Sequence, residues 1–121
     1  MPATIGYLVI DSTNPQQLLP FWCGLLDVQL ATDIGEGQFL VLSPTANGLP
    51  ISFQRVPEPK HVKNRLHLDL VVDDLDAATA EIEGLGGRWL EPDTTRELDG
   101  YIWRIMADPE GNEFDIVLAS A

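Results

Sequence analysis

The stretch NRLHLDLVVDDLDAA, from Asn64 to Ala78, decides the fold of this chain. Its first part alternates strictly between apolar and mostly polar residues, and successive side chains of a strand point to opposite faces. One face carries Leu66, Leu68, Leu70 and Val72, and the other carries Arg65, His67, Asp69 and Val71. We therefore expect a strand that buries one face under a helix and leaves the other face for chemistry.

A helix should follow this strand directly. Asp74 is suited to cap it, because a carboxylate accepts the free backbone N–H groups of a first helical turn. Gly86 and Gly87 predict its end, since glycine adopts the left-handed conformation of a C-cap at little cost. Between them, apolar residues recur at helical spacing at Leu75, Ala78, Ile82 and Leu85. A strand followed by an amphipathic helix is the unit that we expect the fold to repeat.

The composition narrows the class of protein. At 121 residues the chain is long enough for one domain with its own core. Nineteen acidic residues against seven basic ones give a formal net charge of -12. This charge argues against a nucleic acid as partner, because phosphates are bound mainly by cationic side chains. A strongly acidic surface keeps a protein soluble and favours cationic ligands.

The sequence also bears on location. The single cysteine, Cys23, cannot form an internal disulfide, and its large apolar neighbours indicate a small core residue. Residues 1–11 lack the basic flank and apolar centre of a secretory signal, and no apolar run has membrane-spanning length. These features predict a cytoplasmic protein with no membrane partner.

The same order of elements is predicted twice. We expect the first half to contain a strand, a helix and three strands at Thr4–Asp11, Asn14–Leu26, Val28–Ile34, Gln38–Leu42 and Ile51–Val56. Pro20 predicts a kink in the helix or a late start near Leu18, because proline removes a backbone hydrogen bond. We expect the second half to contain the strand 65–72, the helix Asp74–Leu85, and strands at Arg88–Glu91, Tyr101–Ala107 and Phe114–Leu118. Residues 92–100 are predicted to form a loop.

Four of the seven basic residues lie in the connector from Arg55 to Arg65. This stretch is either a solvated linker or a local patch for an anion or an interface.

Aligning the two halves pairs four residues of chemical interest. Matching the opening strands places Tyr7 on His67, and matching the closing hairpins by their glycines places Ser52 on Asp115. We expect all four on the helix-free face of their strands.

Three motifs span nearly the whole chain, namely NPQQLLPFW at Asn14–Trp22, HLDLVVDDLDAA at His67–Ala78 and DPEGNEFDI at Asp108–Ile116. Together they resemble the vicinal oxygen chelate superfamily, which includes glyoxalase I, bleomycin-resistance proteins and extradiol dioxygenases. The run FQRVPEPKHVKNRLHLDL at Phe53–Leu70 is similar to small glyoxalase-like proteins. The resemblance implies one α+β domain over residues 1–121, with βαβββ modules at 1–57 and 65–121 and a linker at 58–64. It also implies a cup-shaped mixed sheet with helices outside, and a homodimer.

The resemblance also implies positions for a metal ion. Enzymes of this superfamily hold a divalent ion in the cup through ligands from the first and last strand of each module, which here are Tyr7, Ser52, His67 and Asp115. Only His67 and Asp115 are ordinary ligands, and they would hold zinc, nickel, iron or manganese. Gln54 could replace Ser52 only with a shift of register. Two strong ligands are fewer than a tight metal site needs.

Besides a purely structural role, for example in a dimer whose exposed strand edges pair, two functions of different classes remain open. The first, which we favour, is a protein that binds a small cationic or aromatic molecule in the cup, with Tyr7, Ser52, Gln54 and Trp103 as ligand-binding residues. Trp103 is predicted to face inward, although the alternation equally allows the opposite face with Arg104.

The alternative is a metal-dependent lyase or dioxygenase that acts on a substrate with neighbouring oxygens. Asp69 would then be its catalytic residue, as a base or as the group that orients His67. Asp69 could equally form an ordinary ion pair with Arg65.

Overall fold

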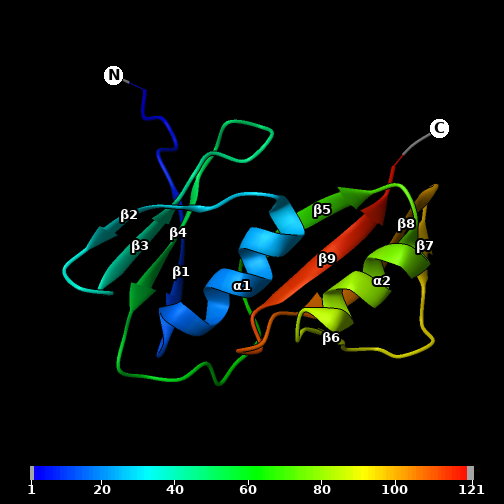
Figure 1. The fold of residues 1–121 in the computed structure, drawn as a ribbon. Helices are drawn as coiled ribbons and strands as arrows, with labels where there is room; N and C mark the ends of the chain where they lie inside the picture. Colours follow the sequence, from blue (N-terminus) through cyan, green and yellow to red (C-terminus); the bar gives the residue numbers. More distant parts are fainter. Residues whose placement is uncertain (1, 120–121) are drawn as a thin grey trace. The chain divides into compact units, whose positions relative to one another are not determined.

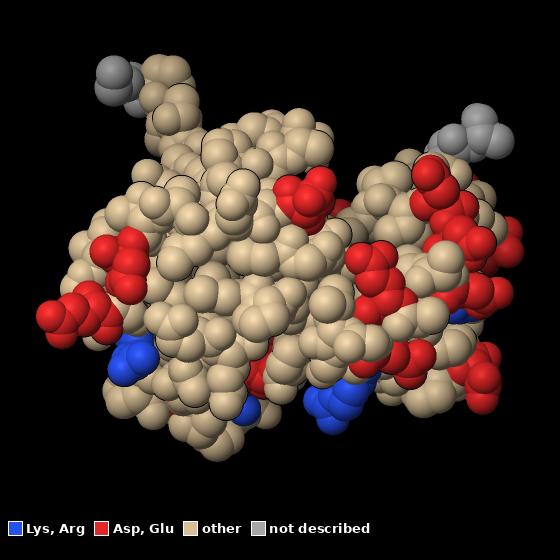
Figure 2. Space-filling view, viewed as in Figure 1, with Lys and Arg blue, Asp and Glu red and all other residues tan. Residues whose placement is uncertain are grey.

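The computed structural model describes residues 2–119, and they form two compact units that divide between Pro59 and Lys60 (Figure 1). This division lies inside the linker predicted at 58–64. Each unit contains one helix and one mixed sheet, so the predicted α+β class is confirmed. Acidic side chains outnumber basic ones on the face shown in Figure 2. No helix within residues 2–119 has both the length and the apolar character needed to cross a membrane.

The first unit follows the predicted order of strand, helix and three strands. Its elements are β1 (Leu8–Ser12), α1 (Pro15–Leu26), β2 (Leu30–Ile34), β3 (Phe39–Leu42) and β4 (Ile51–Arg55). The strands lie in the order β1-β4-β3-β2, with β1 parallel to β4 and the other pairs antiparallel. The ladder of β1 starts where Leu8 pairs with Ile51, so the strand begins later than the predicted Thr4.

Helix α1 packs on β3 and β4 and supplies much of the core of this unit. It runs from Pro15 without a break, so the predicted late start near Leu18 is wrong and a kink at Pro20 stays a prediction. Leu18 and Phe21, on either side of the proline, are almost fully buried. Their packing holds the helical turn despite the lost hydrogen bond, because tertiary burial outweighs local propensity.

The second unit repeats this order with one additional strand. Its elements are β5 (Asp69–Val72), α2 (Leu75–Gly84), β6 (Arg88–Trp89), β7 (Arg96–Leu98), β8 (Tyr101–Ala107) and β9 (Glu113–Leu118). The sheet has the order β5-β9-β8-β6, with β7 also paired to β8, and α2 packs on β6 and β9. Strand β5 is shorter than predicted, and Leu66 is 76% exposed, so its predicted burial is wrong.

Strand β7 corrects the predicted loop at residues 92–100. Asp99 and Gly100, between β7 and β8, have φ values of 50° and 85°. Two successive residues with positive φ make the tight turn that suits a two-residue β-hairpin, and Asp-Gly is a favoured sequence for it. The Asp-Gly dipeptide is the local signal for this turn in the sequence.

The predicted caps of α2 are confirmed. The Asp74 carboxylate accepts a hydrogen bond from the Ala77 backbone N–H at 3.0 Å. At the other end Gly86 has a φ of 100°, and the Gly87 N–H donates to the Ile82 carbonyl at 2.9 Å. This is a Schellman ending, which requires the left-handed conformation at Gly86.

The hydrogen bonds also confirm the internal repeat. Val9 pairs with Ser52 in the first unit as Asp69 pairs with Asp115 in the second. The turns before the last strands match as well, because the Gly48 N–H donates to Thr45 as the Gly111 N–H donates to the Asp108 carbonyl. The alignment made on glycines therefore places equivalent backbone positions together.

Arg104 ties α2 to the sheet from the helix side. Its guanidinium donates to the Leu75 carbonyl at 3.2 Å, to Thr79 Oγ1 at 2.8 Å and to Thr95 Oγ1 at 3.0 Å. It also pairs with Asp76 at 2.8 Å and lies 4.3 Å from the ring centre of Trp89. Because Arg104 faces the helix, its neighbour Trp103 faces the open side of the sheet.

Candidate functional site

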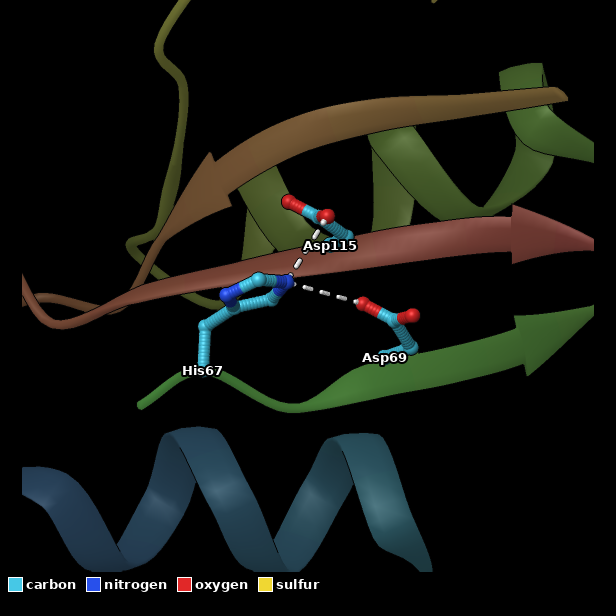
Figure 3. A group of neighbouring side chains, drawn as sticks. All are labelled: His67, Asp69 and Asp115. Atoms are coloured by element: carbon cyan, nitrogen blue, oxygen red, sulfur yellow. Dashed lines mark ion pairs between the residues drawn. The ribbon is translucent and has the colours of Figure 1, made fainter. Parts of the chain in front are cut away.

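Three side chains converge on the helix-free face of the second sheet: His67, Asp69 and Asp115 (Figure 3). Asp69 and Asp115 are direct partners in the parallel ladder of β5 and β9, so their side chains leave the sheet on the same side. His67 comes two residues before Asp69, just ahead of β5, and points the same way. We call this group of two aspartates and one histidine the acid trio.

The acid trio is close enough for its members to share one bound atom. His67 Nε2 lies 3.3 Å from Asp69 Oδ1 and 3.3 Å from Asp115 Oδ2. One ligand atom from each residue lies within 4.8 Å of the others. The Asp115 side chain is 15% exposed, whereas His67 and Asp69 are about half exposed. The Asp115 carboxylate therefore forms the floor of the group, and the other two stand at its opening.

Electrostatics favour a cation at the acid trio. Burial raises the pKa of Asp115 above its usual value, His67 opposes this rise, and the neighbouring Asp69 carboxylate adds to it. Two carboxylates at this separation repel each other, and removal from water weakens the solvation of the inner one. A positive charge between them, on a ligand or a metal ion, relieves both costs.

The acid trio opens into a hollow of about 570 Å³ built by the second unit alone. Apolar side chains form one wall, namely Leu98, Tyr101, Trp103, Ile105 and Val117. The ladders give their arrangement, because Ile105 pairs with Asp115 and Trp103 pairs with Val117 in the next row. The apolar wall therefore continues directly from the carboxylates along the same sheet face.

The segment before His67 is held by Glu113, at the start of β9. Lys63 Nζ donates to Glu113 Oε2 at 2.6 Å, and the Asn64 N–H donates to Oε1 at 3.2 Å. Asn64 Nδ2 also donates to the Glu113 backbone carbonyl at 3.0 Å. Burial raises the pKa of Glu113, but Lys63 and Asn64 outweigh it and the net pKa is lowered. Part of the basic connector thus has a defined partner, which sequence reasoning did not find.

The predicted site residues divide between the two units. Trp103 lines the same hollow as the acid trio, as its predicted orientation requires. Tyr7, Ser52 and Gln54 belong to the first unit: Tyr7 is 58% exposed ahead of β1, Ser52 is fully buried on β4, and Gln54 is half-buried. Ser52 Oγ has no hydrogen-bond partner among residues 2–119. The ligand-binding roles of these residues stay predictions.

Asp69 is the residue whose surroundings sequence reasoning described least well. Within the described part of the chain its ion pair is with His67, and none joins it to Arg65. The sequence pattern predicts a base or an orienting group at this position rather than a third ligand. The parallel register that sets it beside Asp115 was the missing information.

The donors of the acid trio suit a divalent metal ion. One imidazole and two carboxylates within 4.8 Å form a mixed nitrogen and oxygen set. Such sets are used for iron(II), manganese and zinc, and three protein ligands leave coordination positions for a substrate. The structure thus offers one more donor than the two ordinary ligands expected from sequence.

Solved structures with the same fold carry related descriptions. A glyoxalase/bleomycin resistance protein/dioxygenase family enzyme from Burkholderia phytofirmans PsJN has a TM-score of 0.77 at 18% identity, over 98% of this chain and 100% of that chain. The fosfomycin resistance protein FosX from Listeria monocytogenes has a TM-score of 0.74 at 12% identity, over 99% and 96%. A glyoxalase/bleomycin resistance protein from Albidiferax ferrireducens T118 has a TM-score of 0.70 at 13% identity, over 95% and 98%. A search of the curated proteins found no match.

A family-model match over nearly the whole chain, together with the paired modules, places the chain in the vicinal oxygen chelate superfamily, as the sequence motifs predicted. Within that class it belongs to the family of the glyoxalase-like domain, whose model matches residues 7–117.

Proposed function

We propose that this protein binds a small molecule with a flat apolar body and a cationic group in the hollow of its second unit. The observation that carries the proposal is the direct junction between an aromatic wall and two convergent carboxylates. A volume of about 570 Å³ lies in the range of ordinary ligand sites, which is about 300–1,000 Å³.

The apolar wall explains the preference for a flat body. Trp103 and Val117 are direct partners across β8 and β9, so an indole face and a branched side chain lie side by side. Leu98 and Tyr101 pair across the hairpin and are each 65% exposed. Exposed apolar side chains that line a hollow gain free energy when a ligand covers them, and aromatic ligands gain further from stacking.

The acid trio explains the preference for a cation. Asp115 lies at the floor and has lost part of its hydration, so a positive group beside it strengthens an interaction that water no longer screens fully. Asp69 offers a second carboxylate on the same side of the sheet. An ammonium group could donate hydrogen bonds to both, while its apolar body extends toward Trp103.

Isothermal titration calorimetry with 2-naphthylmethylammonium tests this proposal. We expect measurable binding that weakens about tenfold in Trp103→Ala and in Asp115→Asn, a loss of about 1.4 kcal/mol in each case. Asp73→Asn removes the same charge from an exposed position outside the hollow and should bind like the parent. Equal affinity in Trp103→Ala, Asp115→Asn and the parent would contradict the proposed site.

The acid trio supports a second candidate function, a metal-dependent lyase or dioxygenase. Its supporting observation is that one donor atom from each of His67, Asp69 and Asp115 lies within 4.8 Å of the others. A divalent ion held there would supply Lewis-acid polarisation of neighbouring oxygens on a substrate. The residues of the chain would hold the ion and position the substrate body against Trp103.

Metal analysis tests the second function. Protein purified without chelator should carry close to one divalent ion per chain, and His67→Ala should lose it. Asp69→Asn separates the two roles of that residue, because a ligand role predicts weaker metal binding whereas a base role predicts lost turnover with metal retained. Failure to bind nickel, zinc, manganese or iron(II) after soaking would exclude the metal-dependent function.

A further inference from the structure

We propose that the hollow reverses its preference for ligand charge when the acid trio holds a divalent cation, and that Lys63 and Arg96 then recognise an anionic ligand. The inference rests on the proposed function, because it concerns the same hollow and the same apolar wall. It adds a specificity role for two residues that the sequence analysis did not assign to the site.

The charged side chains that line the hollow have a small negative excess. One divalent ion can offset this excess and so change which ligand charge the hollow prefers. The lining contains four carboxylates, on Asp69, Asp99, Glu113 and Asp115, and two permanent cations, on Lys63 and Arg96. The empty hollow therefore has an excess of negative charge and favours a cationic ligand. A doubly charged ion brings the lining close to neutrality and concentrates positive charge at the acid trio.

Both cations line the same hollow as the acid trio. The pKa of Lys63 is raised mainly by Glu113 and that of Arg96 mainly by Glu91, with a smaller contribution from Asp115 to each. Arg96 pairs with Trp103 in the ladder of β7 and β8, which places it beside the aromatic wall. An anion on a flat molecule stacked there would face a hollow that both cations line.

Neither cation uses all of its hydrogen-bond donors on its present carboxylate partner. Glu91 engages Nε and one terminal nitrogen of Arg96, which leaves the other terminal nitrogen as a donor. Lys63 uses one contact with Glu113, and its side chain is 73% exposed. An ammonium group has three donors, and a guanidinium has five, so each can bind an anion and keep its carboxylate partner.

Competition follows from the same geometry. The carboxylates that would bind an organic cation are the ligands that would bind a metal ion, so the two cannot occupy the acid trio together. Each therefore lowers the apparent affinity of the other, and does so more strongly as its own concentration rises. Zinc should thus displace a cationic ligand, and it should improve the binding of an anionic one.

A matched pair of probes tests the reversal. Calorimetry with 2-naphthylmethylammonium and 2-naphthoate, which share one flat body and differ in charge, is performed on metal-free and on zinc-saturated protein at constant ionic strength. The metal-free protein should bind the ammonium probe at least about tenfold more tightly than the carboxylate, and the zinc form should show the opposite order.

Substitutions test which residues bind the anionic probe. Lys63→Met combined with Arg96→Met should weaken 2-naphthoate binding to the zinc form about tenfold and should tighten ammonium binding to the metal-free protein, because it removes two positive charges from the lining of the hollow. Lys60→Met is the control, because Lys60 also contacts Glu113 but does not line the hollow. It removes one positive charge and should leave both probes unaffected.

The outcomes separate this inference from the proposed function. An unchanged order of the two probes after zinc loading, failure of zinc to bind, or an unaffected double variant would overturn the charge reversal alone. If neither probe binds either form of the protein, the hollow is not a ligand site, and the proposed function and the reversal both fail.

Discussion

Replacing Arg104 with methionine should destabilise the protein by about 2–4 kcal/mol, as worked out from its contacts. Three of its four hydrogen bonds go to α2 and the fourth goes to Thr95, while its stack on Trp89 holds the guanidinium over the sheet that carries the acid trio. A hydrogen bond from a charged donor contributes about 1.5–3 kcal/mol net to stability, and a cation–π contact removed from water contributes about 2 kcal/mol. The pair with Asp76 adds little because that carboxylate is 89% exposed.

The estimate is smaller than the sum of these contributions. Methionine retains apolar contact with Trp89, and the Leu75 carbonyl keeps its bond from Thr79 Oγ1 at 2.7 Å, so no buried acceptor is left unpaired there. Arg104→Lys keeps the charge but loses the planar fork, and should cost about 1–3 kcal/mol.

Urea denaturation followed by far-UV circular dichroism measures this loss. Arg88→Met is the matched control, because Arg88 is exposed on β6, and it should change the free energy of unfolding by less than about 0.5 kcal/mol. A loss of less than about 0.5 kcal/mol in Arg104→Met would refute the reasoning that this network anchors the helix.

Three further predictions concern stability. The hydrogen-bonded ion pair with Arg96 lowers the pKa of Glu91 below 4.5. The stabilisation by this pair is therefore present above pH 4.5, and it is lost as the pH falls through the lower pKa of Glu91 in the folded protein. Glu91→Gln should therefore be less stable than the parent at pH 7 and equal to it in acid, as measured by urea denaturation across pH. Asp74→Ala should cost about 1 kcal/mol by loss of its cap bond, whereas Asn14→Ala should cost less because its side chain makes no such bond; equal losses would argue against the capping assignment. Gly100→Ala should cost about 1–2 kcal/mol because of its positive φ, whereas Gly84→Ala, in helix, should stabilise by about 0.5–1 kcal/mol in the same assay.

Much of the fold could be predicted because its signals are local. Alternation placed His67 and Asp69 on one strand face, and the cap residues Asp74 and Gly86 marked the ends of α2. Where two local signals conflicted, burial decided between them. Packing of Leu18 and Phe21 carried α1 through Pro20, and the local penalty for proline could not reveal this.

The site could be predicted only in part. The resemblance pointed to His67 and Asp115, together with Tyr7 and Ser52 of the first unit, whose roles stay predictions. The structure adds Asp69 beside Asp115, because the parallel ladder of β5 and β9 sets the two directly opposite each other. Arg96 was missed for a similar reason, since it lay in a segment predicted to be a loop, whereas Lys63 lay in the connector for which an anion patch was one interpretation.

By itself, the sequence determined the paired modules, the caps and turns, and the sheet face on which the histidine and its carboxylates lie, because each depends on neighbours along the chain. Only the tertiary structure decided which polar groups meet. Asp69 joins Asp115, Lys63 binds Glu113, and Arg104 faces α2, all through contacts between residues far apart in sequence. Such meetings depend on strand register and on helix packing, and no local pattern encodes either.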